Sequence, residues 1–161
     1  LPCAVKVMKA EKPSALEIRN FLEEGRVMAS VAHPCIASCY MVTCRPYPAI
    51  ILELLGPALS GRSMNNSGFT VAFCGAASAL DHLHKNGIVH RDVKPAHLLR
   101  TNPNTYRVKL IDFDACESLQ QEAAHGPGTL FYAPMPWTGW GRVQLDHYAF
   151  GATFMELLGD Q

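Results

Sequence analysis

A short polar segment at residues 88–99 carries the side chains with the clearest chemistry. Asp92 and Lys94 lie between two apolar runs, and Pro95 restricts the backbone that follows them. Asp92 can orient an attacking hydroxyl and accept its proton, while Lys94 can neutralise charge on a transferring phosphoryl group. A surface turn with an Asp–Lys pair would have the same composition. The segment is therefore suited to phosphoryl transfer but does not by itself establish it.

A second carboxylate follows at Asp112, 20 residues after Asp92, where a predicted strand at 107–113 ends. The Thr-Asn-Pro-Asn sequence at 101–104 predicts a hairpin turn. Closing that hairpin would bring the carboxylates of Asp92 and Asp112 close together at its open end. One carboxylate for a metal and one for a hydroxyl is the division of labour that phosphoryl transfer requires. An ordinary acidic turn after a strand is the alternative.

A lysine with a possible role in a cleft occurs near the start of the chain. Val5 and Val7 flank Lys6 in a predicted strand at 4–8, and alternation places Lys6 on the opposite face from the two valines. The ammonium group can therefore enter a cleft. A solvated lysine on an edge strand is the competing interpretation.

The elements that must position these groups follow from local patterns. A helix is predicted over 14–31, with Ser14 as its N-cap and Glu17 at the capping-box position. Two strands are predicted at 36–43 and 49–55, joined by a proline-containing turn.

Two further helices are predicted in the second half of the chain. One covers 69–84, with Asn86-Gly87 as its stop signal. The other covers 146–158 and is apolar on nearly all sides, which is typical of a helix inside a larger domain. Gly56-Pro57 marks the expected boundary between the two halves.

Composition excludes several classes of protein. The chain has 161 residues, 48% of them hydrophobic, which is enough for one globular core, and a net charge of zero argues against nucleic-acid or anionic-membrane partners. We find no apolar window long enough to span a membrane and no secretory signal. Six cysteines lack zinc-site spacing, so we expect buried thiols in a reducing compartment and a cytoplasmic location.

Taken together, these segments resemble the motifs of eukaryotic protein kinases. The likeness lies in family order in Ala4-Val5-Lys6, His33-Pro34-Cys35-Ile36, residues 88–99, Asp112-Phe113-Asp114, residues 128–134 and residues 146–151. It implies an α/β (α+β), two-lobed protein-kinase-like fold that is truncated at both ends. Residues 1–55 would form a partial N-lobe that consists of a small sheet plus a helix. Residues 56–161 would form a partial, mainly helical C-lobe, which contains the catalytic loop and the activation segment and ends in the helix after Asp146.

The resemblance assigns roles in catalysis. Asp92 would be the base and Lys94 the transition-state cation, the latter typical of the serine/threonine branch. Asp112 would hold the metal. The family pattern selects Glu24, counted back from the His-Pro-Cys-Ile sequence at 33–36, as the partner of the ATP-phosphate anchor Lys6.

The resemblance also assigns the adenine site and the activation segment. The backbone of the hinge, with Glu53 and Leu55, would bond adenine. Residues 128–134 resemble the segment in which Thr129 faces the base. Ser118 and Thr129 are candidate phosphorylation sites whose added phosphate would pair with Arg91.

Several residues depart from the family pattern. No glycine-rich loop precedes Lys6 in this sequence, so we expect a kinase-like fold without the phosphate lid and two strands. His97 stands where the family has a metal-binding Asn, so the resemblance makes it a candidate metal ligand beside Asp112. Asp114 replaces the flexible Gly after Phe, and Met135 replaces the Glu after Ala-Pro.

We therefore expect a serine/threonine protein kinase that uses ATP and magnesium, or manganese, on a protein substrate. The alternatives are a pseudokinase or nucleotide-binding scaffold without catalysis, and an inactive kinase fragment. The substrate, the pathway, the regulatory partners and the oligomeric state are not encoded in any recognisable motif. The apolar helix at 146–158 and the missing strands predict poor stability for the chain alone.

Overall fold

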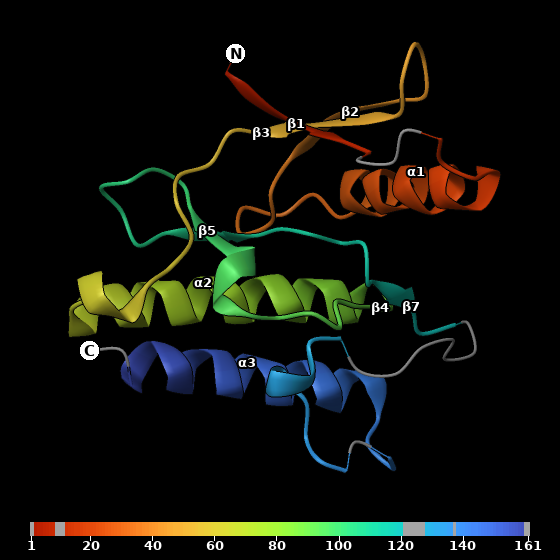
Figure 1. Cartoon of the computed structure of the whole chain (residues 1–161). Coiled ribbons are helices and arrows are strands. Elements are labelled where there is room, and N and C mark those ends of the chain that lie inside the picture. Colours follow the sequence, from red (N-terminus) through yellow and green to blue (C-terminus); the bar gives the residue numbers. More distant parts are fainter. Residues whose placement is uncertain (1, 9–11, 121–127, 137, 160–161) are drawn as a thin grey trace.

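The computed structural model describes residues 2–8, 12–120, 128–136 and 138–159. Its first lobe is a three-stranded antiparallel sheet of β1 (Cys3–Val7), β2 (Cys39–Thr43) and β3 (Ala49–Glu53), in the order β1-β3-β2. Helix α1 (Ala15–Ser30) lies below this sheet, between it and the second lobe (Figure 1). The predicted elements of this lobe are present, although both hairpin strands are shorter than expected.

Local signals explain where α1 begins and how it packs. The side chain of Ser14 accepts a hydrogen bond from the Glu17 backbone N–H, and the Glu17 carboxylate accepts from the Ser14 N–H, which completes the predicted capping box. Gly25 is buried where α1 meets the sheet, and a Cβ there would lie 2.6 Å from Cγ2 of Val42. The glycine therefore allows the helix to approach the sheet closely.

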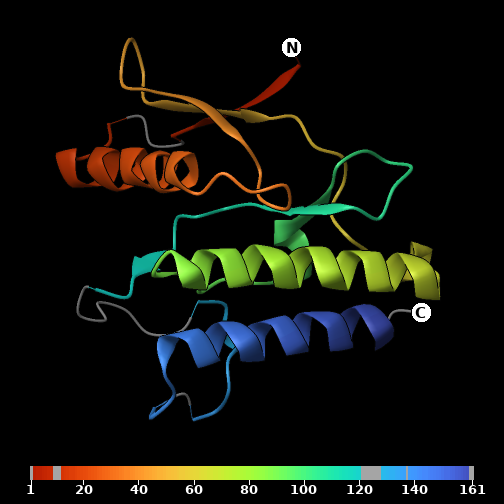
Figure 2. The same ribbon diagram turned by 180° about the vertical axis from the view of Figure 1, so that it is seen from behind.

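The second lobe is built on two long helices, α2 (Asn66–Lys85) and α3 (Arg142–Gly159), which lie side by side in both views (Figures 1 and 2). Asn65 caps the start of α2, and Gly87, with a φ of 72°, follows its predicted Asn86 stop. Helix α3 begins at Arg142, earlier than predicted, so Asp146 lies within the helix instead of at its cap.

Short strands carry the loops above these helices. The predicted hairpin is present as β5 (Leu98–Arg100) paired antiparallel with β6 (Val108–Leu110), and β4 (Ile88–Val89) pairs with β7 (Glu117–Ser118). Three 3-10 turns complete the lobe: η1 (Gly61–Ser63), η2 (Pro95–His97) and η3 (Leu130–Tyr132).

One continuous core connects the two lobes. The segment after α1 joins β6 through a bridge between Ile36 and Leu110, with the Ala37 N–H donating to the Leu110 carbonyl at 3.0 Å. The largest fully buried hydrophobic side chains are Phe113, Ile36, Ile50, Leu83, Leu98, Leu110 and Leu157. Because the core runs beneath the loops that follow β4 and β6, it fixes the relative positions of those loops.

One expectation about burial agrees with the structure and one needs correction. Helix α3 leaves part of its apolar surface uncovered, as expected for the chain alone, because Met155 is 68% exposed and Leu158 is 46% exposed. Of the six cysteines, Cys3, Cys44 and Cys74 are exposed, so the expectation of buried thiols is wrong for these three. Within the described ranges, no helix is both long and apolar enough to cross a membrane.

The exposed apolar face of α3 leads to a stability prediction. Large apolar side chains left in water each forgo roughly 1.5–3 kcal/mol of burial energy. We expect the chain to melt below about 60 °C and to self-associate. Changing Met155 and Leu158 to Lys should reduce that association without lowering the melting temperature. Calorimetry and light scattering measure both effects, and a sharp melt of the unmodified monomer above this temperature would contradict the prediction.

Candidate active site

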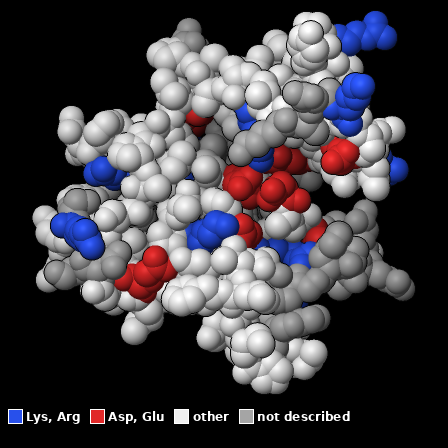
Figure 3. All heavy atoms as spheres, viewed as in Figure 1, with Lys and Arg blue, Asp and Glu red and all other residues white. Residues whose placement is uncertain are grey.

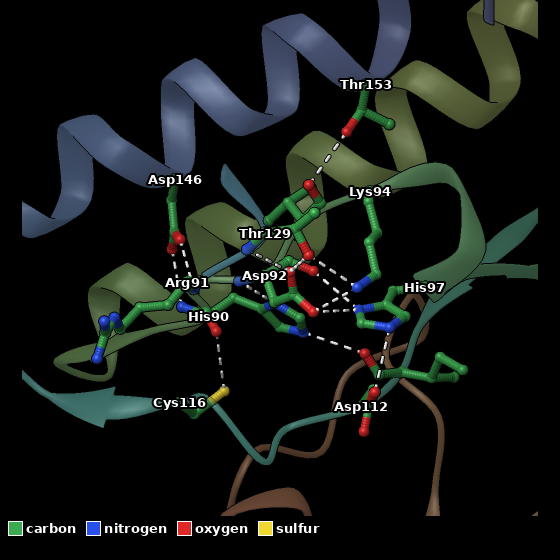
Figure 4. A network of polar contacts seen from close by, with 12 residues as sticks. His90, Arg91, Asp92, Lys94, His97, Asp112, Cys116, Thr129, Asp146 and Thr153 are labelled. Carbon is green, nitrogen blue, oxygen red and sulfur yellow. Dashed lines mark hydrogen bonds and ion pairs between the residues drawn. The ribbon is translucent and has the colours of Figure 1, made fainter. Parts of the chain in front are cut away.

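The loop after β4 is held from behind by a buried carboxylate. Asp146 is fully buried in α3, and its two oxygens accept hydrogen bonds from the backbone N–H groups of His90 at 2.8 Å and Arg91 at 2.7 Å (Figure 4). His84 of α2 contacts the same carboxylate at 2.8 Å. Arg91 has a φ of 69°, a conformation that costs energy in a non-glycine residue. Asp146 offsets that cost by accepting hydrogen bonds from the two consecutive N–H groups of His90 and Arg91.

Asp92 and Lys94 converge on one hydroxyl group. The Lys94 ammonium donates to Asp92 Oδ2 at 2.7 Å and to Thr129 Oγ1 at 2.9 Å. The Thr129 hydroxyl donates in turn to Asp92 Oδ1, and its backbone N–H donates to the same oxygen at 3.0 Å (Figure 4). The predicted approach of Thr129 to this pair is confirmed.

The activation segment can make this approach only through a glycine. A Cβ on Gly128 would lie 2.1 Å from the backbone oxygen of Arg91, a distance that no side chain tolerates. Burial raises the pKa of Asp92, but the hydrogen bonds from Lys94 and Thr129 outweigh it and hold the pKa below its usual value. Asp92 is therefore ionised at neutral pH and can act as a proton acceptor.

The sheet lobe contributes a cation between two carboxylates. Lys6 Nζ lies 2.7 Å from Glu24 Oε1 and 2.8 Å from Asp112 Oδ1. The predicted Lys6–Glu24 contact is thus present, and it explains how a nearly buried glutamate is tolerated in α1. Burial lowers the pKa of Lys6, but its hydrogen bonds to Asp112 and Glu24 more than compensate and raise it. Burial raises the pKa of Glu24, and Lys6 opposes that effect.

His97 connects the two predicted carboxylates. Its Nδ1 lies 2.8 Å from the backbone oxygen of Asp92, and its Nε2 lies 3.1 Å from Asp112 Oδ2. The hydrogen bond from His97, with that from Lys6, holds the pKa of Asp112 far below its usual value despite burial. Figure 3 shows acidic and basic atoms gathered in the hollow between the lobes.

The donors present fit a metal ion only in part. No group of three or more His, Cys, Asp or Glu side chains suited to a metal occurs in the part of the chain that the structure describes. Magnesium bound beside phosphates takes only one or two protein carboxylates, which Asp112 satisfies. The imidazole of His97 offers nitrogen to an ion that prefers oxygen. The assignment of His97 as a metal ligand stays a prediction.

The predicted hinge residues Glu53 and Leu55 make contacts within the chain. The Glu53 carboxylate accepts hydrogen bonds from Lys109 Nζ at 2.6 Å and from the Ser38 N–H at 3.2 Å. Burial alone would raise the pKa of Glu53, but the hydrogen bonds from Lys109 and Ser38 outweigh burial and lower the pKa below its usual value. Leu55 packs against the core. The Glu53 side chain thus ties β3 to β6, and the predicted contacts of the Glu53 and Leu55 backbones with adenine remain untested.

A family model of the protein kinase domain matches residues 2–161. The chain belongs to the protein kinase family. It is similar to the serine/threonine-protein kinase PknJ of Mycobacterium tuberculosis, with 31% identity over 96% of this chain and 29% of that protein. It is 28% identical to PknB of the same species, over 96% of this chain and 28% of PknB.

The ovarian-specific serine/threonine-protein kinase Lok of Drosophila melanogaster is 26% identical over 63% of this chain and 23% of Lok. The chain therefore spans less than a third of the length of these curated relatives. Their names agree with the serine/threonine type that Lys94 indicates, and the two-lobed kinase fold expected from the sequence is confirmed. The proposed lobe boundary at residues 55 and 56 stays a prediction.

Sequence reasoning missed some contacts of the kinase site. The Tyr132 hydroxyl donates to Glu156 Oε2 of α3 at 2.5 Å. The pKa of Tyr132 is raised, mainly because the phenol is partly buried and also because the Glu156 carboxylate lies next to it. This bond fastens the activation segment to α3 near the position where Met135 replaces the family's Glu. No spacing rule joins Tyr132 to Glu156, so only the packing of η3 on α3 reveals it.

Arg91, the expected partner of an added phosphate, already has a carboxylate partner in this structure. Its guanidinium group forms an ion pair with Glu117 of β7, and its side chain is only 7% exposed. Ser118 lies in the same short strand, which pairs with β4. Residues 121–127, between this strand and Gly128, lie outside the described residues.

Proposed function

We propose that the chain transfers the γ-phosphoryl group of ATP to serine or threonine hydroxyls of protein substrates. The observation that carries this proposal is the hydroxyl of Thr129, which contacts both Asp92 and Lys94. An acceptor hydroxyl needs the same two neighbours, because one must take its proton and the other must balance charge on the transferring group.

The residues divide the work as follows. Asp92 accepts the proton of the attacking hydroxyl, and Lys94 stabilises negative charge as the phosphoryl group moves. Lys6 binds the ATP phosphates, and Glu24 fixes the direction of the Lys6 side chain. Asp112 would hold a divalent ion, which would neutralise charge on the phosphates when bound.

The direct test is transfer of labelled γ-phosphate from ATP to a generic basic protein substrate. Transfer that depends on a divalent ion and on Asp92 supports the proposal. Absence of transfer under every metal condition, with retained ATP binding, would replace it with the second candidate below.

The second candidate is a pseudokinase that binds nucleotide without turnover. One observation favours it: Asp112 already contacts Lys6 through one oxygen and His97 through the other. A metal ion must therefore compete with two existing partners of the carboxylate.

The choice of metal separates the two candidates. With His97 in place, we expect turnover to be faster with manganese than with magnesium, because a transition-metal ion tolerates an imidazole ligand better. His97→Asn should restore magnesium-dependent transfer by roughly tenfold, the lower end of what residues around a metal contribute. The assay is phosphate transfer with each metal for the parent and the variant.

Asp114→Gly serves as the companion variant in this assay. If the exposed Asp114 carboxylate has become an oxygen ligand, its removal should lower activity instead of freeing the loop. If the parent and His97→Asn are both silent with both metals, the enzyme interpretation fails and the pseudokinase interpretation takes its place.

A further inference from the structure

A histidine supports the turn that follows α1. The Ile36 N–H donates to the His33 carbonyl at 3.0 Å, which closes a turn at residues 33–36, the α1 turn. The Cys35 N–H donates to Nδ1 of the His33 ring at 3.1 Å. The Cys35 carbonyl accepts in turn from the Leu110 N–H of β6 at 2.8 Å. The imidazole therefore holds the segment through which α1 is joined to the helical lobe.

The hydrogen bonds of the ring fix its protonation state. A backbone N–H can only donate, so Nδ1 of His33 must accept and carries no proton. The proton of the neutral ring is then on Nε2, which lies 3.3 Å from Oγ of Ser78 on α2 and can donate to it. A proton added to Nδ1 would place two donors against each other and break the bond from Cys35. The α1 turn therefore requires a neutral His33.

Helix α2 places a second imidazole against this ring. His33 stacks on His82, with the ring centroids 4.8 Å apart and the planes 24° apart, so two protonated rings would repel each other. Asp81 of α2 favours protonation of His33, but its carboxylate is exposed and pairs with Lys85 at 2.7 Å. The charge that α2 presents to the ring is therefore largely offset.

The other elements around His33 also favour the neutral ring. Lys109 of β6 lines the same cavity of about 430 Å³ as His33, and its charge is balanced by Glu53 at 2.6 Å. From α1 this cavity is lined by Met28 and Ala29, which do not ionise. Burial raises the pKa of the Cys35 thiol, so that thiol is neutral. Burial and then His82 lower the pKa of His33.

We propose that His33 is a pH-dependent link between α1 and α2, which holds the α1 turn on the helical lobe when neutral and releases it when protonated. A free imidazole has a pKa of about 6.5. Because the pKa of His33 is lower than this in the folded chain, the unfolded chain takes up the proton first as the pH falls. The stability that His33 contributes is therefore complete above about pH 6.5 and is lost as the pH falls from there through the folded-state pKa.

The test measures backbone hydrogen exchange of residues 31–37 by mass spectrometry, so it does not depend on catalysis. Protection is compared at neutral pH and near the acid end of the histidine range, after correction for the intrinsic pH dependence of exchange. These amides should lose protection by roughly three- to tenfold in acid, the range expected for one lost hydrogen bond. Residues 66–75 of α2 contain no histidine and should lose less. Equal loss in both segments would overturn the proposal.

His33→Asn is the decisive variant. An Asn side chain can accept the N–H two residues further on, as it does in turns, but it does not titrate in this range. It should protect residues 31–37 like the parent at neutral pH and abolish the pH dependence. His82→Phe keeps a stacked ring without its charge, so the loss of protection should move to higher pH. His147→Gln removes an exposed histidine of α3 and is the matched control. Parent-like pH dependence in His33→Asn would contradict the proposal.

A nuclear magnetic resonance titration of the parent decides the matter even if a variant does not fold. The ring nitrogen shifts of His33 should show the neutral tautomer with its proton on Nε2 at neutral pH. A ring that carries its proton on Nδ1 at neutral pH, or on both nitrogens, would overturn the proposal.

Discussion

Asp92→Asn should reduce phosphoryl transfer by about 10²–10⁴-fold, the usual contribution of a positioned general base. The Asn side chain cannot take the proton of the attacking hydroxyl. Its oxygen can still accept the Thr129 N–H, which now bonds Asp92 Oδ1 at 3.0 Å, so the activation segment should stay in place. The measurement is the turnover rate with saturating ATP and a generic basic protein substrate.

ATP-analogue affinity is the internal reference for this variant. Among the described contacts, Asp92 has none with Lys6, so calorimetric affinity should change little. Asp81→Asn is the matched control, because Asp81 forms an exposed ion pair with Lys85 on α2. Transfer by Asp92→Asn within a few-fold of the parent would remove Asp92 from its assigned role.

Lys6→Ala should weaken ATP-analogue binding by at least roughly tenfold, since a hydrogen bond to a charged group contributes about 1.5–3 kcal/mol. It should also destabilise the fold, because the Glu24 carboxylate would remain in a site where it is only 3% exposed. A solvated edge lysine would produce neither effect. Calorimetry with the analogue and denaturant unfolding measure the two consequences separately.

A double variant distinguishes binding from stability. Lys6→Ala combined with Glu24→Gln removes the unpaired buried charge, so it should recover stability while nucleotide affinity stays low. Lys85→Ala, which breaks an exposed pair with Asp81, is the control for loss of a surface lysine. Unchanged affinity in Lys6→Ala would return Lys6 to the role of an ordinary strand residue.

Local sequence patterns predicted those features that depend on neighbours in the chain. The capping box of Ser14 and Glu17, the stop at Asn86 and Gly87, and the hairpin of β5 and β6 all follow from hydrogen bonds between residues a few positions apart. The same is true of the strand that presents Lys6. These interactions depend on local backbone geometry, which is largely independent of how the rest of the chain packs.

The order of the motifs predicted more than the local patterns could. Resemblance to protein kinases selected Glu24 from three glutamates on its helix, and the Lys6–Glu24 contact is present at 2.7 Å. It also predicted that Thr129 would face Asp92 and Lys94. The roles assigned to these residues remain predictions, since proximity alone does not demonstrate binding or turnover.

Tertiary structure alone decided the contacts between distant segments that carry no shared motif. The pairing of Arg91 with Glu117 depends on the register of two short strands, and the bond from Tyr132 to Glu156 depends on how η3 packs against α3. No helical pattern accounts for glycine at position 25, whereas a Cβ there would lie only 2.6 Å from Cγ2 of Val42. The sequence determines which chemical groups are available and how each helix is capped. The close packing of separate elements determines which buried charges meet. This is because a buried charge is stable only beside an opposite charge, and that partner lies on an element that is distant in the sequence.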